Sequence, residues 1–241
     1  MIPWFWSGPR PRALLFEHVP KCGGTAIRKY LERHYTPRQI YGVYDRRPGE
    51  REAFRSLPES QRHAYDLVIG HGVHELLDWC KSDIVAATIL RKPVERIVSH
   101  YYYVRERPEH YLHEAVVGRN LSLGEYAASN LSIELRNNMV CRFLGVGPDE
   151  AERDPQRSVD TAWEILRSRY GVVGVVERLG PAMNMIRQTV GLRRVWSGER
   201  TNRTRSRPPI EDVSAEDRRM IEAHNALDIE LYRRVAEVAP A

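Results

Sequence analysis

The sequence has few cysteines and no long apolar segment. Its three cysteines, Cys22, Cys80 and Cys141, form no C-x-x-C pair and no even set. This argues against a disulfide framework or a structural zinc site and suits a reducing compartment. No apolar run approaches the ~20 residues that cross a bilayer, and the start of the chain lacks a basic leader followed by an apolar stretch. We therefore expect no membrane span, no metal cofactor and a cytoplasmic protein.

Internal repeats and low-complexity linkers are also missing, and the composition is that of a globular protein. Hydrophobic residues make up 42% of the 241 residues and charged residues 29%. We predict a single domain over residues 1–241, with residues 1–12 as a flexible tail. The net charge of +5 favours anionic partners but does not choose among nucleic acid, an anionic cofactor and an acidic glycan.

Short apolar runs alternate with helical segments along the chain. The expected strands cover residues 14–19, 66–70, 84–90 and 172–176. Helices are expected after Pro93 and over residues 111–117, 123–130, 133–144, 158–170 and 181–190, and a closing helix begins after an N-cap at Ser214. This alternation predicts a three-layer α/β fold with a central, mainly parallel sheet flanked by helices.

The stretch "LLFEHVPKCGGTAIRKYLERHY" predicts a phosphate-binding loop. It reads as a strand, a glycine turn and a helix, an arrangement in which backbone N–H groups point at an anion. Gly23 and Gly24 supply the turn, Thr25 a hydroxyl and Lys21 a positive charge. The lysine precedes the glycines, whereas in a nucleoside triphosphatase loop it follows them.

Two further strand ends carry candidate site residues. Arg91 follows the third strand, and Ser99 lies about two helical turns further along, so an arginine and a hydroxyl are placed to clamp a phosphate. His71 follows the second strand between two glycines, where a general base would be expected. His74 is the second candidate, and His100 is expected to be packed.

Five segments, in order, resemble sulfotransferases that use 3′-phosphoadenosine-5′-phosphosulfate, particularly the carbohydrate group related to heparan sulfate 2-O-sulfotransferases. They are "EHVPKCGGTAI", "VIGHGVHEL", "ILRKPVERIVSHYYYVR", "VGVVERL" and "NALDIELYRRV". The resemblance implies a P-loop-like version of the α/β fold. It also implies a nucleotide sulfate donor and a hydroxylated saccharide or other small molecule as acceptor.

The resemblance also implies roles for particular residues. The loop Lys21, Cys22, Gly23, Gly24 and Thr25 would hold the 5′-phosphosulfate, with Lys21 stabilising the leaving adenosine 3′,5′-bisphosphate. Arg91 and Ser99 would hold the 3′-phosphate, and His71 would be the base. The basic stretch 193–209 would close over the donor through Asn202, Arg203 and Thr204.

Two other functions stay open. A nucleotide kinase of related fold would carry its lysine after the glycines and an acidic residue at a strand end for Mg²⁺, but the third strand ends in Arg91. A non-enzymatic module would bind nucleic acid or another anion through Arg193–Arg207. Whether Cys22 has a lowered thiol pKa stays open, since a helix N-terminus can lower it. Glu177 is expected to pair with an arginine.

Overall fold

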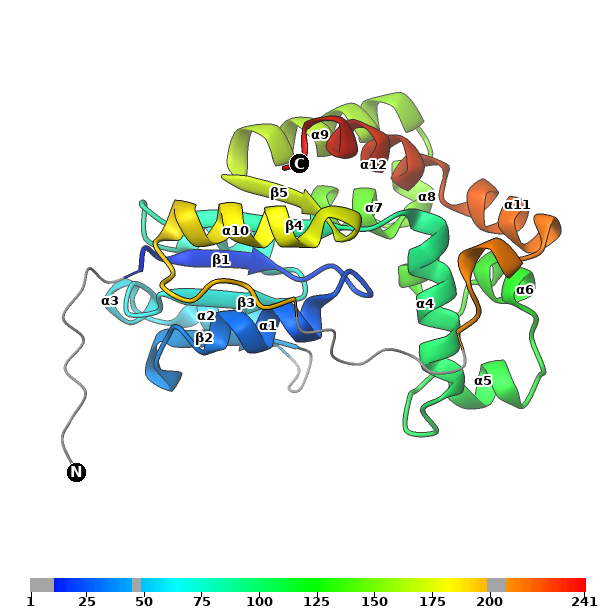
Figure 1. Ribbon diagram of the computed structural model, residues 1–241, viewed down its shortest axis with the longest axis horizontal. Helices are drawn as coiled ribbons and strands as arrows, with labels where there is room; N and C mark the ends of the chain where they lie inside the picture. Colours follow the sequence, from blue (N-terminus) through cyan, green and yellow to red (C-terminus); the bar gives the residue numbers. More distant parts are fainter. Residues whose placement is uncertain (1–10, 45–48, 199–206) are drawn as a thin grey trace.

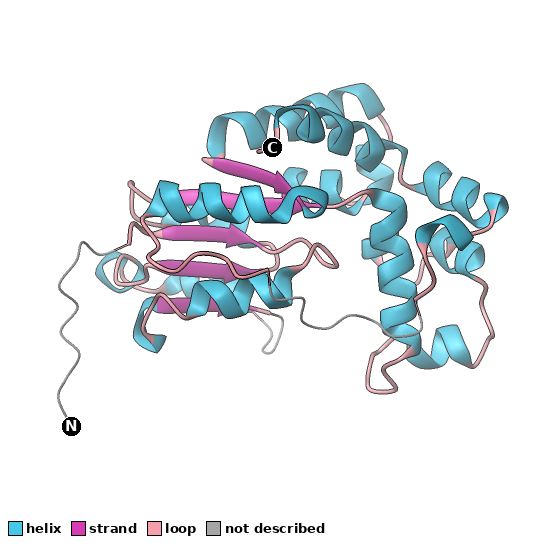
Figure 2. Cartoon of the chain, in the orientation of Figure 1, coloured by secondary structure: helices cyan, strands magenta, loops and turns pink. Residues whose placement is uncertain are grey.

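The computed structural model describes residues 11–44, 49–198 and 207–241, and its centre is a parallel sheet. The strands are β1 (Leu14–Glu17), β2 (Ile40–Val43), β3 (Leu67–Gly70), β4 (Val85–Leu90) and β5 (Val172–Val175). They pair in the order β2-β3-β1-β4-β5, every pair parallel (Figure 2). The predicted α/β class and four strands are confirmed. The edge strand β2 was missed because its sequence, "IYGV", is short, contains glycine and is only partly buried.

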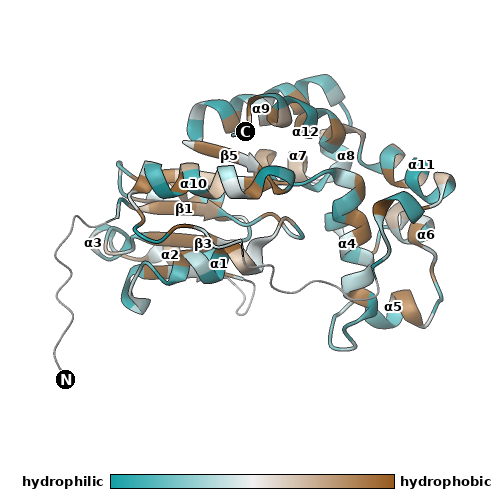
Figure 3. Cartoon of the chain, in the orientation of Figure 1, coloured by the Kyte–Doolittle hydropathy of each residue, from teal (hydrophilic) through white to brown (hydrophobic). Residues whose placement is uncertain are grey.

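Helices cover both faces of the sheet. Successive strand residues such as Leu14 and Leu15 belong to different hydrophobic clusters, because successive side chains of a strand point to opposite faces of the sheet. One face packs against α1 (Gly24–Glu32) and α10 (Leu179–Val190) (Figure 1). The other packs against α2 (Glu50–Ser56), α7 (Asn138–Leu144), α9 (Pro155–Arg169) and α12 (Ala226–Val238). The strands are the most apolar part of the drawing in Figure 3.

A third hydrophobic cluster lies beyond the carboxyl ends of the strands. It is formed by α4 (Pro93–Arg105), α5 (His113–Val117), α6 (Leu123–Ala128), η3 (Ile133–Leu135) and α11 (Ala215–His224). Pro93 is the first residue of α4, as predicted. The shorter elements are η1 (Pro37–Gln39), α3 (Glu59–Arg62), η2 (Val73–Trp79), α8 (Pro148–Ala151), η4 (Val176–Arg178) and η5 (Ile210–Asp212). No helix in the described ranges is long and apolar enough to cross a bilayer.

Two predicted helices are interrupted, and the two interruptions contact each other. The helix expected over residues 133–144 breaks at Asn137, whose φ is +46°. The closing helix begins after the Ser214 cap, as predicted, but breaks at Asn225. The Asn137 side-chain oxygen accepts from the Leu227 amide at 3.0 Å, and the Asn225 side chain donates to the Leu135 carbonyl at 3.0 Å. The buried asparagines thus satisfy backbone groups across the gap.

A buried charge network joins the same elements to α4. The side chains of Arg96 and Asp228 are both fully buried, with 3.8 Å between nitrogen and oxygen. The Asp228 carboxylate also accepts from the amides of Met139 and Val140 at 3.0 and 2.9 Å, at the start of α7. Removing one partner of such a pair leaves an uncompensated buried charge, so this network fixes how α4, α7 and α12 meet.

The strand order decides which loops are neighbours. Strands β3, β1 and β4 are adjacent, and the chain leaves β1 toward β2 and β4 toward β5. Ligands of open α/β sheets bind outside the carboxyl ends of the strands at such a reversal. The three loops that carried the sequence motifs therefore meet at one edge.

Candidate active site

The glycine loop after β1 is shaped by a histidine that packs against it. Lys21 and Gly23 have φ angles of +66° and +81°, and α1 starts at Gly24. A Cβ on Gly24 would lie 1.5 Å from the Nε2 atom of His18, so only glycine fits there. The first amides of a helix lack partners within the helix. The amides of Gly24 and Thr25 are therefore placed to bind an anion.

Lys21 extends across the cavity toward helix α4. Its ammonium nitrogen lies 3.4 Å from the centroid of the Tyr103 ring, and its carbonyl accepts from Arg91 Nη1 at 3.2 Å. Burial, together with the positive charges of Arg107 and Arg91, lowers the pKa of Lys21 to about 7. An anion bound beside it would restore the ammonium form.

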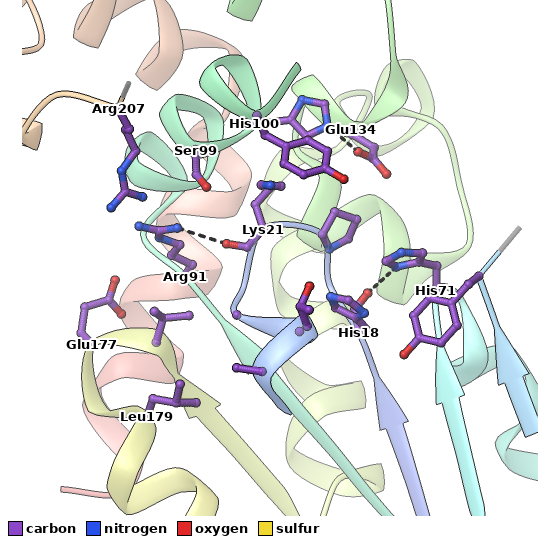
Figure 4. A pocket seen from close by; sticks show the side chains of 18 of the residues that line it. His18, Lys21, His71, Arg91, Ser99, His100, Glu134, Glu177, Leu179 and Arg207 are labelled. Atoms are coloured by element: carbon purple, nitrogen blue, oxygen red, sulfur yellow. Dashed lines mark hydrogen bonds and ion pairs between the residues drawn. The ribbon is translucent and has the colours of Figure 1, made fainter. Parts of the chain in front are cut away.

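Arg91 and Ser99 face the same cavity from β4 and α4 (Figure 4). The Arg91 side chain is 11% exposed and donates to Glu95 Oε2 at 3.2 Å. Its Nε is buried with no hydrogen-bond partner in the described part of the chain. Ser99 is buried among its neighbours on the cavity wall. A fixed guanidinium and a hydroxyl on one wall form a suitable phosphate clamp.

His71 sits in a turn that only glycines permit. Gly70 has a φ of +150° and Gly72 one of +70°, and a Cβ on Gly70 would lie 1.8 Å from the Val43 carbonyl oxygen. The His71 Nδ1 atom is 2.7 Å from the carbonyl oxygen of His18. Because a carbonyl only accepts, Nδ1 carries the hydrogen, and neutral His71 keeps its lone pair on Nε2.

A buried carboxylate holds this turn in place. Glu17 is fully buried at the end of β1 and accepts from the amides of Gly72 and His74, both at 2.9 Å, and from Arg142 at 3.3 Å. Burial alone would raise the pKa of Glu17, but the His74 hydrogen bond and the Arg142 charge outweigh it and lower the pKa to about 2. In the sequence, Glu17 is marked only as the acidic residue that ends an apolar strand.

The glycine loop, His71, Arg91 and Ser99 border one cavity of about 1040 Å³. Of the candidates, the structure brings together Lys21, Gly23, Gly24, Thr25, His71, Arg91 and Ser99. His74 does not line the cavity and contacts Glu17 instead. The cavity also includes residues that sequence reasoning missed: His18, Tyr44, Tyr103 and Glu134. His18 and Tyr103 lie within two of the segments that carried the resemblance but were not singled out there, whereas Tyr44 and Glu134 lie outside all five segments, so only the fold places them at the cavity.

His18 is the nearest of these residues to the base. Its ring lies 4.6 Å from the His71 ring and 5.8 Å from the Tyr44 ring, centroid to centroid. Burial and the neighbouring His71 lower the pKa of His18 to about 3, so it stays neutral. It thus fills the space between the glycine loop and the base without adding charge.

Several expectations need correction or lie outside the described residues. Cys22, expected among the donor-binding loop residues, is buried in the hydrophobic core and does not line the cavity, and burial raises its thiol pKa to about 12, opposite to the lowering that a helix N-terminus can cause. Glu177 accepts from the Tyr232 hydroxyl at 2.7 Å and the Lys92 amide at 3.4 Å, and no arginine among the described residues pairs with it as expected. Asn202, Arg203 and Thr204 lie outside the described residues, as do residues 1–10 of the expected tail. Arg12 is anchored through its amide to Val190.

Comparison with known proteins shows which family the chain belongs to. A profile of the sulfotransferase family matches residues 9–233, nearly the whole chain. The protein therefore belongs to the sulfotransferase family and is an enzyme of sulfuryl transfer, which requires an activated sulfate donor and an acceptor. No curated protein sequence matches the chain significantly.

Proposed function

We propose that the enzyme transfers a sulfuryl group from 3′-phosphoadenosine-5′-phosphosulfate to a hydroxyl group of a saccharide or another small acceptor. One observation carries the proposal: three adjacent strand ends bring an anion loop, an arginine clamp and a histidine with a free lone pair to one cavity. The carbohydrate subgroup named by the sequence resemblance stays a prediction.

The donor would bind along the glycine loop and the start of α4. The loop amides and Lys21 would hold the 5′-phosphosulfate, and Arg91 and Ser99 the 3′-phosphate. Asn202, Arg203 and Thr204 remain proposed donor contacts on the basis of the resemblance alone. The buried position of Ser99 and the unpartnered Nε of Arg91 support the clamp.

In the transfer step, the bond between sulfur and the phosphate oxygen breaks as a bond forms from the acceptor oxygen to sulfur. The acceptor proton passes to Nε2 of His71, and the bisphosphate leaves with the electron pair of the broken bond. Its growing negative charge would be stabilised by Lys21 and the loop amides. Positioning and charge stabilisation should dominate, as in phosphoryl transfer. We propose that no metal is needed.

The product offers a direct test, because a ligand that binds only the folded state raises the unfolding temperature with its concentration. We expect adenosine 3′,5′-bisphosphate to raise the unfolding temperature progressively with its concentration. We also expect labelled donor to pass its sulfate to a pool of hydroxylated metabolites. An oligonucleotide at equal phosphate concentration tests the nucleic-acid alternative, and ATP with Mg²⁺ tests the kinase. Equal stabilisation by the oligonucleotide, or dependence on ATP and Mg²⁺, would replace the proposal.

A further inference from the structure

A carboxylate faces the cavity on the side opposite the glycine loop. Glu134 lies in η3, lines the cavity, and keeps 27% of its side chain exposed. Figure 4 shows it beside His100, with Lys21 and His71 on the neighbouring walls. The donor is an anion, so this carboxylate does not suit the donor and needs another explanation.

The backbone around Glu134 is held from three directions. Its carbonyl accepts from the fully buried Arg96 at 2.8 Å, and its amide donates to the Ser132 hydroxyl at 3.2 Å. The carbonyl of Leu135 accepts from Asn225 at 3.0 Å. Glu134 is thus fixed by the same buried network that joins α4 to α12, unlike a mobile surface acid.

Its carboxylate is also oriented. His100 Nε2 lies 2.9 Å from Glu134 Oε2, and His100 Nδ1 lies 2.5 Å from the Tyr126 hydroxyl. The carboxylate accepts, so Nε2 carries the hydrogen and Tyr126 donates to Nδ1. Burial lowers the pKa of His100, which therefore stays neutral in this relay. Burial alone would raise the pKa of Glu134, but the hydrogen bond from His100 outweighs it and lowers the pKa to about 2.

An exposed aromatic ring lies near this carboxylate in the same wall. Tyr111 lines the cavity and is 71% exposed, and its hydroxyl donates to Ser132 at 3.0 Å, two residues before Glu134. Its ring stacks on His110 with centroids 4.8 Å apart. Large exposed rings beside a cavity provide apolar area with a polar rim, a combination common at ligand sites.

From these contacts we infer that Glu134 and Tyr111 form an acceptor subsite that selects a neutral or amino sugar and rejects an acidic one. The sugar ring packs on Tyr111, and a hydroxyl or ammonium group next to the reacting hydroxyl donates to Glu134. A carboxylate or sulfate at that position meets a fixed negative charge. The inference rests on the proposed function and names its acceptor class.

The test compares methyl β-glucoside, methyl β-glucosaminide and methyl β-glucuronide with labelled donor. For the wild type we expect kcat/KM to be at least about tenfold higher for the first two sugars, since an unfavourable like-charge contact costs several kcal/mol. Glu134→Gln should reduce this ratio to about threefold or less by improving the glucuronide and weakening the glucosaminide. Glu114→Gln removes a charge from α5 outside the cavity and should leave the ratio unchanged.

The aromatic part of the subsite needs its own pair of variants. Tyr111→Leu should raise KM for every sugar that is used, whereas Tyr111→Phe, which keeps the ring, should not. The inference is overturned if the wild type prefers the glucuronide, if Glu134→Gln leaves the ratio unchanged, or if none of the sugars is sulfated while adenosine 3′,5′-bisphosphate still binds. Loss of bisphosphate binding in the wild type would instead overturn the proposed function.

Discussion

The two walls of the cavity are built in different ways. On the proposed donor wall, His71 and Arg91 each follow a parallel strand directly and Lys21 lies in the loop after β1, so main-chain geometry places all three at one edge of the sheet. On the proposed acceptor wall, Glu134 and Tyr111 lie in short helices and turns beyond that edge; the buried Arg96 holds the Glu134 carbonyl, and Ser132 accepts from the Tyr111 hydroxyl. The sheet positions the donor wall, and a polar network positions the acceptor wall.

This difference has a consequence for variation between related enzymes. A strand-end residue takes its position mainly from the sheet, although the turn of His71 also depends on the buried Glu17. A residue held by a buried network moves when any member of that network changes, because such networks act as units. We therefore expect donor chemistry to tolerate sequence change around the site better than acceptor choice does.

The largest effect should come from the base on the donor wall. His71→Ala removes the group that takes the acceptor proton, so transfer should fall by about 100-fold or more, the usual contribution of a general base. Affinity for adenosine 3′,5′-bisphosphate should barely change because His71 faces the acceptor. Both are measured on the purified variant, with labelled donor for transfer and calorimetry for binding.

His63→Ala is the control for that variant. His63 follows the short helix α3, does not line the cavity, and lies 3.8 Å from the Glu59 carboxylate. It should retain full activity. If His71→Ala kept more than about a tenth of wild-type turnover, the base would have to be sought elsewhere in the cavity.

A smaller effect should appear in the choice of donor. Arg91→Ala should weaken use of 3′-phosphoadenosine-5′-phosphosulfate but hardly change that of adenosine-5′-phosphosulfate, which lacks the 3′-phosphate. The preference should shrink by about tenfold or more, because hydrogen bonds to charged groups contribute ~1.5–3 kcal/mol. The ratio of kcat/KM for the two donors measures this.

Ser99→Ala should act in the same direction as Arg91→Ala but more weakly, since its hydroxyl is neutral. Arg169→Ala breaks a surface ion pair with Asp78 and should leave the ratio unchanged. Equal losses with both donors in Arg91→Ala would make Arg91 structural, through its bonds to the Lys21 carbonyl and to Glu95.

The same contrast explains what the sequence could predict. Four of the five described strands were predicted correctly, and the glycine loop, Arg91, Ser99 and His71 were named as candidates that line one cavity, because each signal lies within one short segment. Glu134 and Tyr126 gave no such signal, since each gains its role from a partner tens of residues away. The question left open for the Cys22 pKa is answered by burial, because the loop turns that side chain into the core, where burial dominates and raises the pKa. The sequence pattern of a short segment does not show whether a side chain at a turn is buried.

The last and smallest effect concerns pH and Lys21, the residue that reaches from the donor wall to Tyr103. Its pKa is lowered to about 7 in the free enzyme by burial and by the charges of Arg107 and Arg91. A bisphosphate beside it favours the ammonium form, so binding raises that pKa and takes up a proton at pH values between the two. Below pH 7 the lysine is protonated in both states and contributes no pH dependence.

Affinity for adenosine 3′,5′-bisphosphate should therefore fall as pH rises above about 7, by at most about tenfold per pH unit for one proton. Calorimetric Kd values between about pH 6.5 and about pH 8.5 would measure this, in a range where the phosphates, with a second pKa of about 6, are largely ionised. Lys21→Met has no such proton and should bind more weakly with a flatter pH profile. His71→Ala removes the proposed base but keeps Lys21, so its pH profile should match the wild type. An equally steep profile in Lys21→Met would show that another group takes up the proton, and Lys21 would then be charged in both states.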